Sequence, residues 1–169
     1  MTSELRVDRI VPVDGVPSGG GGGVVQVAVG RRYSEIGDST STSFMASGLI
    51  ASMTPRFSTS KFHIHMGGGR LKARAGTGVE VAMYVSINGG SYAKCYSGNR
   101  GVQFYYSSST AEIQVPVSFV DLFTPSTPVT STISFQPYWK SFNNGNNTFL
   151  EYDSASYAEV VMTVMEVSA

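Results

Sequence analysis

The sequence predicts an all-β fold, an antiparallel β-sandwich or jelly roll of about eight strands with an extended N-terminal arm. Charged residues make up only 14% of the 169 residues, whereas glycine (19 residues) and aromatic residues (11%) are plentiful. This composition is typical of short strands joined by tight turns rather than of surface helices. Apolar residues recur mostly with a period of two, as they do on the two faces of a strand. A chain of this length can bury roughly 70% of its unfolded surface, which is enough for one core.

Residues 1–18 are predicted to form an extended arm that docks on a partner. The apolar residues of the arm mostly alternate, and they are Leu5, Val7, Ile10, Val11 and Val13. Residues 19–23 are consecutive glycines, which have the greatest backbone freedom and no side chain to pack. We therefore divide the chain into a docking arm (1–18), a polyglycine hinge (19–23) and one jelly-roll body domain (24–169). A disordered tail on a linker is the alternative, but the apolar content of the arm favours docking.

The body is expected to contain strands and no helix. Residues 25–29 and 62–66 alternate between apolar and other residues, as half-buried strands do. Residues 79–87, followed by Asn88-Gly89-Gly90 and by residues 91–96, predict a hairpin whose turn needs positive φ. Further strands are expected at roughly 31–36, 42–54, 101–107, 111–122, 130–139 and 157–167.

No pattern of residues predicts catalysis, and we expect neither an enzyme nor a cofactor. The serines lack a Gly-x-Ser-x-Gly motif, and the carboxylates are scattered without a paired arrangement. Gly67-Gly68-Gly69, followed by Arg70, faintly resembles a phosphate cradle, but it lacks a strand-loop-helix context. We therefore interpret residues 67–74 as a mobile basic loop.

Charge and cysteine content exclude several classes of partner. Twelve basic and twelve acidic residues cancel, so no net field attracts nucleic acid or an anionic membrane. The first residues lack the apolar core of a signal peptide, and no segment approaches the roughly 18 apolar residues of a membrane helix. Cys95 is the single cysteine, so an intrachain disulfide is excluded, as suits assembly in the cytosol.

His63 and His65 are the two histidines of the chain, and on a strand both point to the same face. One strand supplies two ligands where a closed metal site needs about four to six, although a three-fold axis would provide six imidazoles. Polar residues on a solvent or interface face, or a pH-sensitive subunit contact, are the alternatives.

Aromatic residues follow one another at two places, and consecutive residues of a strand cannot all face the core. We predict that part of them pack against another subunit, because aromatic residues are enriched at interfaces. The residues assigned to this subunit interface are Phe104, Tyr105, Tyr106, Tyr138 and Trp139. A sugar-binding platform is the alternative, with loops 97–100 and 141–149 facing a host surface glycan.

Three segments carry a family resemblance. Residues 3–10 (SELRVDRI) resemble the extended opening of many tailed-bacteriophage virion proteins. Residues 41–55 (STSFMASGLIASMTP) and 58–64 (STSKFHI) resemble the "sTsyvdtGLtasiTPssatSKilv" run of small phage jelly-roll domains, and residues 157–167 (YAEVVMTVMEV) are similar to their last strand, "atltvmEi". The matching segments lie towards the start and at the end of the body domain, and residues 67–156 match the family only loosely. The chain departs from the pattern at His63 and His65, where the family carries aliphatic residues.

The resemblance implies a homotrimer and a place in a virion assembled in the bacterial host cytoplasm. The expected function is that of a non-enzymatic capsid decoration (cement) protein or head or tail fibre subunit. Its expected partners are copies of itself and the major capsid or tail protein, which it joins through the arm. A host receptor- or glycan-binding tip of a tail fibre is the alternative function.

Overall fold

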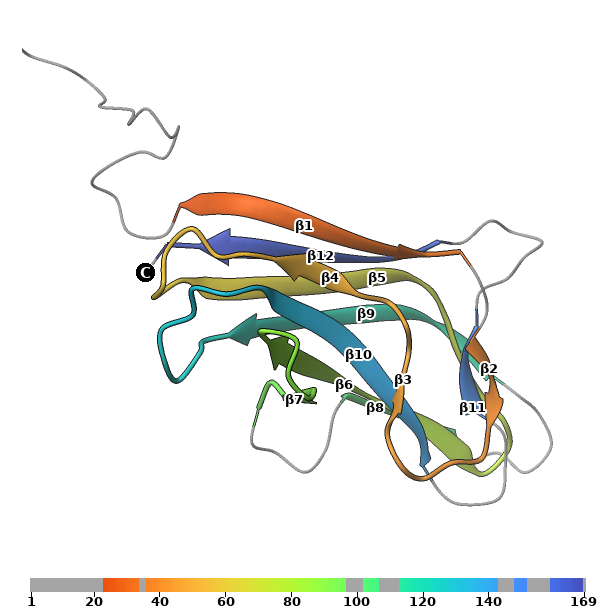
Figure 1. Ribbon diagram of the computed structural model, residues 1–169. Helices are drawn as coiled ribbons and strands as arrows, with labels where there is room; N and C mark the ends of the chain where they lie inside the picture. The colour runs from red at the N-terminus through yellow and green to blue at the C-terminus, as the bar shows by residue number, and fades with distance from the viewer. Residues whose placement is uncertain are drawn as a thin grey trace, which may run out of the picture.

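The structure is a computed structural model that describes residues 23–33, 36–96, 102–106, 113–142, 148–151 and 159–168. Every regular element in these ranges is a β-strand, and the strands form two antiparallel sheets around one core (Figure 1). The prediction of an all-β antiparallel sandwich is confirmed. The predicted arm and residues 19–22 of the predicted hinge lie outside the described residues.

The first sheet is centred on β5. Its four long strands, in spatial order, are β1 (Val24–Arg32), β12 (Val160–Val167), β5 (Lys61–Ala73) and β9 (Ile113–Phe123). Two short strands, β2 (Ile36–Ser39) and β11 (Thr148–Glu151), pair with each other. β11 also pairs with the second half of β5, along the edge that β12 occupies in the first half.

The second sheet is centred on the pairing of β10 with β6. Its strands are β3 (Met45–Ala46), β4 (Ala51–Met53), β10 (Ile133–Phe142), β6 (Thr77–Ile87), β7 (Ala93–Lys94) and β8 (Val102–Tyr106). β3 and β4 pair with β10, while β7 and β8 pair with β6. Without β2, β3, β7 and β11, the strands have the orders β1-β12-β5-β9 and β4-β10-β6-β8. Successive members of this set mostly alternate between the sheets, and the last pairs with the first, as in a jelly roll.

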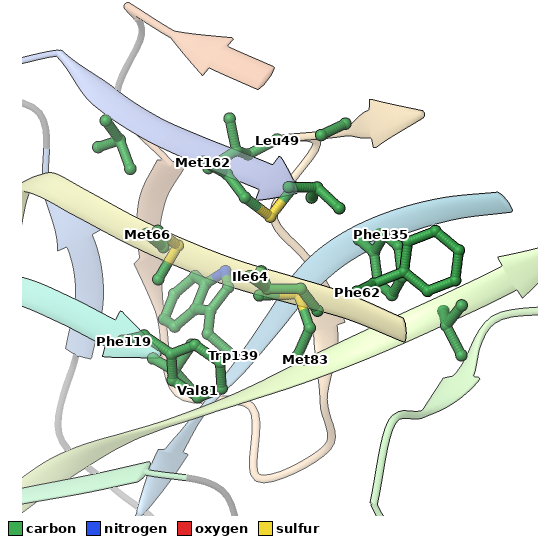
Figure 2. Packing of buried hydrophobic residues seen from close by; sticks show 14 of the residues in the cluster. Leu49, Phe62, Ile64, Met66, Val81, Met83, Phe119, Phe135, Trp139 and Met162 are labelled. Carbon is green, nitrogen blue, oxygen red and sulfur yellow. The ribbon is translucent and has the colours of Figure 1, made fainter. Parts of the chain in front are cut away.

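The core consists of the inward side chains of both sheets (Figure 2). Phe62 of β5 and Phe135 of β10 are fully buried, with ring centroids 5.5 Å apart. Figure 2 shows Trp139 pointing from β10 into the space between the sheets, together with Phe119 and Val81. Trp139 is 2% exposed. Aromatic side chains from strands distant in the sequence therefore join the two sheets.

The glycine run of β5 is a strand with a bulge, and the prediction of a mobile loop at residues 67–74 is wrong. β5 continues to Ala73, and its pairing with β9 changes register between Gly67 and Arg70. Gly68 has φ +84°, and a Cβ there would collide with the main-chain oxygen of Glu159. Glycine is needed here because the neighbouring chain passes too close for a side chain and because φ is positive.

The hairpin prediction is confirmed, and the expected strand at 42–54 is divided. Asn88 and Gly89 have φ of 54° and 69° between β6 and β7. Gly48, with φ 74°, lies between β3 and β4. The main-chain oxygen of Ser47 accepts a hydrogen bond from Nη1 of Arg32 at 2.9 Å. The chain therefore turns at this point instead of forming one long strand.

A buried carboxylate fixes one end of the sandwich. Glu166 of β12 is 0% exposed. Its Oε1 accepts hydrogen bonds from the main-chain N–H groups of Arg56 and Phe57, at 2.9 and 3.1 Å, and from the Ser60 hydroxyl at 2.6 Å. Its Oε2 accepts one from Gln26 at 2.6 Å. Glu166 thus satisfies the donors of the β4–β5 turn and ties that turn to β1.

Candidate functional site

The outer face of the first sheet presents two rows of side chains that run across four strands. The register of the sheet gives their members. One row consists of Val27, Met165, His63 and Leu122. The other row consists of Val29, Thr163, His65 and Val120. We call these two rows the apolar face.

The apolar face is open to solvent. Val27, Val29, Val120 and Leu122 are 53%, 47%, 58% and 57% exposed. Single exposed apolar residues are ordinary on protein surfaces, but these form one pair on β1 and one pair on β9, and the rows of β12 and β5 side chains connect the two pairs. The two rows contain no Asp, Glu, Lys or Arg. A contiguous, uncharged surface of this kind marks an interaction site.

The extent of the apolar face follows from strand geometry. Four adjacent strands lie about 4.8 Å apart and rise about 3.3 Å per residue, so the two rows cover roughly 250 Å² in projection. This area is about a third of the roughly 800 Å² that each partner buries in a stable interface. Charged residues lie beyond its two ends, where Arg31 pairs with Glu159 at 2.8 Å and Lys61 begins β5. The charged ends flank rows whose edges are apolar and whose middle includes His63, His65 and Thr163.

Both histidines lie on the apolar face, as their spacing predicts. His63 is half-buried and His65 is exposed, while Phe62 before them and Ile64 between them point into the core. Nδ1 of His63 is buried and has no hydrogen-bond partner among the described residues. Within the part of the chain that the structure describes, no group of three or more His, Cys, Asp or Glu is placed to hold a metal ion. A metal at His63 and His65 therefore requires ligands from outside the described residues.

The outer face of the second sheet carries a cluster of aromatic rings, which we call the tyrosine cluster and which consists of Phe44, Tyr84, Tyr92 and Tyr138. Tyr84 and Tyr138 stack with ring centroids 4.1 Å apart and an interplanar angle of 23°. Phe44 flanks Tyr84 at 5.8 Å, and Tyr92 flanks Tyr138 at 5.9 Å, each tilted relative to its neighbour. All four side chains are half-buried. The rings thus shield one another while leaving part of the cluster in solvent.

Two lysines lie at one end of the tyrosine cluster. The Nζ atoms of Lys94 and Lys140 are 4.4 and 4.8 Å from the centre of the Phe44 ring, within cation–π range. Lys140 also pairs with Glu80 at 3.3 Å, and Gln103 donates a hydrogen bond to the same carboxylate at 2.9 Å. Glu80 is only 1% exposed. Lys140 therefore compensates the buried negative charge, and the two ammonium groups outnumber the one carboxylate at this end of the cluster.

The environment of the cluster favours the protonated form of the Tyr84 and Tyr92 hydroxyls. Burial raises the pKa of Tyr84, and the neighbouring Tyr138 and Glu80 raise it further. Burial and Tyr138 likewise raise the pKa of Tyr92, although a hydrogen bond with Ser134 acts in the opposite direction. Protonated phenols both donate and accept hydrogen bonds. The cluster therefore combines apolar ring surface with neutral hydrogen-bonding groups.

The structure separates the residues assigned to the subunit interface. Trp139 is a core residue with almost no surface left for a second chain, so we correct its assignment. Phe104 is half-buried and lines a cavity of about 190 Å³ between the sheets, with Phe119 and Met66. Tyr138 belongs to the tyrosine cluster. The side chains of Tyr105 and Tyr106, like the docking-arm residues, lie outside the described part of the chain.

Sequence reasoning missed the apolar face, although a signal for it exists. β12 reads VVMTVMEV, with apolar residues at both parities instead of alternate positions. A strand that is apolar on both sides is expected to be covered on both faces. The loops proposed for glycan contact, 97–100 and 141–149, lie mostly outside the described residues.

None of the described elements is a helix long and apolar enough to cross a membrane. No protein-family model matches the sequence, and no curated protein matches it.

Solved structures similar to this chain are distant from it in sequence. One described as "CBM4 structure and function" is 13% identical with a TM-score of 0.26, over 82% of this chain and 89% of that chain. The structure of infectious bursal disease virus Gt strain is 12% identical with a TM-score of 0.32, over 99% of this chain and 41% of that chain. The function of the chain is therefore inferred from its own sequence and surfaces.

Proposed function

We propose that this chain is a non-enzymatic structural subunit of a tailed-bacteriophage virion and that copies of it associate through the apolar face. The observation that carries the proposal is the pair of exposed rows that includes Val29 and Val120 on opposite edges of one sheet. Association removes these side chains from water, which is the main favourable term in most protein assembly.

A second copy of this chain is the occupant that fits the face best. The centre of the face carries no Asp, Glu, Lys or Arg, so two copies meet there without opposing like charges. Its projected area of roughly 250 Å² supplies about a third of what one partner contributes to a stable contact. Closed symmetric assemblies are the commonest way for a protein to bury such a surface. The family resemblance of residues 41–64 and 157–167 favours a homotrimer.

In this proposal, the assembled body joins the particle through residues 1–18. The role is that of a capsid decoration subunit or of a head or tail fibre subunit, with the major capsid or tail protein as partner. The absence of a catalytic motif from the sequence supports a role in binding. Assembly of the virion in the host cytoplasm accords with the single cysteine, because no disulfide is needed.

Analytical ultracentrifugation of the purified chain tests self-association. We expect an oligomer that the double variant Val29→Lys, Val120→Lys converts to monomer, because it places charges in one row of the apolar face. Ser52→Lys is the matched control, since Ser52 is an exposed strand residue of the second sheet. It should leave the oligomer intact.

A monomeric native chain at micromolar concentration would contradict the proposal. So would an oligomer that Ser52→Lys disrupts and the double variant does not, because that result assigns the contact to the other sheet. Cryo-electron microscopy of the particle tests the virion assignment separately, by locating the subunit on the head or the tail.

A further inference from the structure

The tyrosine cluster lies on the opposite side of the sandwich from the apolar face. The apolar face is formed by β1, β12, β5 and β9, whereas Tyr84 and Tyr138 extend from β6 and β10 of the other sheet (Figure 1). Assembly through the apolar face therefore leaves the tyrosine cluster exposed on each subunit. The two surfaces are available at the same time.

Small and polar side chains surround the rings on this sheet. Tyr138 lies opposite Ala82 on one side and Ala46 on the other. In the next row, Tyr84 lies between Gln136 and Lys94. In the row after that, the hydroxyls of Ser134 and Ser52 are 2.8 Å apart. Tyr138 therefore rises above small neighbours, and Tyr84 is flanked by polar side chains. This surface offers aromatic carbon beside hydroxyl groups.

This combination fits the chemistry of a sugar chain. The C–H faces of sugar rings are apolar, while their hydroxyls need hydrogen-bond partners, and tyrosine supplies both kinds of contact at a low cost in conformational entropy. Binding sites for small polar ligands use the same pattern of aromatic walls with a few polar groups.

The charge of the surface narrows the class of sugar. Lys94 and Lys140 both lie within 5 Å of the Phe44 ring centre, whereas Glu80 beside them is 1% exposed. An ammonium group binds a carboxylate through a charge-assisted hydrogen bond, which is stronger than a neutral one. Two half-buried ammonium groups beside one buried carboxylate leave a positive charge, which favours a ligand with carboxylates.

We infer that the tyrosine cluster, with Lys94 and Lys140, binds an acidic polysaccharide, a chain of sugar rings that carry carboxylate groups. The sugar rings contact Tyr84, Tyr92 and Tyr138, and a carboxylate of the chain approaches the two ammonium groups. The inference does not depend on self-association, because the surfaces lie on opposite sheets.

Isothermal titration calorimetry of the full chain tests the inference, with polygalacturonate as the acidic probe and dextran as the neutral one. We expect binding to polygalacturonate and none to dextran. Lys94→Gln and Tyr92→Ala should each weaken that binding at least about fivefold, as expected from loss of one charge-assisted or aromatic contact. Lys61→Gln is the matched control, because Lys61 is an exposed lysine of the first sheet, and it should bind like the native chain.

Four results would overturn the inference. The first three are no heat of binding with polygalacturonate, equal binding to dextran, and affinities in Lys94→Gln and Tyr92→Ala that match Lys61→Gln. The fourth is equal affinity for single-stranded DNA, because the surface would then recognise charge alone. If Tyr92→Ala does not fold, Tyr92→Phe replaces it, since that variant keeps the ring and loses only the hydroxyl. The monomeric variant Val29→Lys, Val120→Lys should still bind polygalacturonate at each site.

Discussion

Glu166 accepts a hydrogen bond from the hydroxyl of Ser60 at 2.6 Å in a position that is closed to solvent. Replacement of Glu166 by alanine leaves this hydroxyl and two main-chain N–H groups without their acceptor. Each unsatisfied buried donor costs about 1–3 kcal/mol, so we expect Glu166→Ala to lower the free energy of unfolding by about 3 kcal/mol in urea denaturation.

Glu159→Ala is the control for that measurement. Glu159 forms a surface ion pair with Arg31, whose side chain is 54% exposed. Exposed pairs contribute about 0–1 kcal/mol, so this variant should remain close to the native chain. Equal losses in the two variants would contradict the structural role of Glu166.

Gly68→Ala should destabilise the chain, whereas Gly67→Ala should not. Gly68 has positive φ and lies against the main-chain oxygen of Glu159, while the nearest atom to a Cβ on Gly67 is 3.5 Å away. We expect a loss of about 3 kcal/mol for Gly68→Ala and less than about 1 kcal/mol for Gly67→Ala. Thermal unfolding followed by circular dichroism measures both, and similar melting temperatures would contradict the bulge.

Stability should fall in alkaline solution because two buried groups hold their protons. Burial and the charge of Asp121 raise the pKa of the Cys95 thiol from 9.0 to a much higher value, and burial and the same carboxylate raise the pKa of Tyr96 from 10.0 to about 12. Between the unfolded and the folded pKa values, the folded chain binds more protons than the unfolded chain. The contribution of these two groups to stability is therefore complete below the unfolded pKa values and decreases as pH rises towards the folded ones.

Urea midpoints between pH 8 and pH 11 measure this effect. Cys95→Ala removes one of the two titrating groups, so the midpoint of this variant should decrease less steeply with pH than that of the native chain. If the midpoint decreases equally steeply with pH in both chains, Cys95 does not contribute to the loss of stability at high pH.

Deletion of residues 1–18 should separate assembly from attachment. We expect the shortened chain to form the same oligomer in analytical ultracentrifugation, because the apolar face lies in the body. It should fail to join particles that lack the subunit in a co-sedimentation assay. Loss of the oligomer after the deletion would refute the division into arm and body.

The fold could be predicted from the sequence because alternation of side chains is a local property. The hairpin at Asn88 needs only its turn residues and the apolar residues of the preceding strand, and it was predicted correctly. The local sequence around Gly68 predicts a loop, because the reason for glycine at this position is the main-chain oxygen of Glu159, which is distant in the sequence. A local pattern of residues does not show that two backbones approach closely.

The candidate surfaces depend on which of the two alternating sets of side chains in each strand faces the core. The sequence shows that Tyr138 and Trp139 cannot both be buried, but it does not show which of them is. The structure places Trp139 in the core and Tyr138 outside. Phe44, Tyr84 and Tyr92 meet Tyr138 only through turns and strand register, so the tyrosine cluster could not be assembled from the sequence.

The position of β12 affects how a new chain reaches its native state. β12 lies between β1 and β5, yet it is synthesised after every other strand of the sheet. While the ribosome is still producing the segment before Val160, the two flanking strands have no partner on their facing edges. Such unpaired edges recruit strands from other molecules. Late closure by long-range pairing is slow, so nascent chains of this protein should need protection from aggregation until β12 inserts.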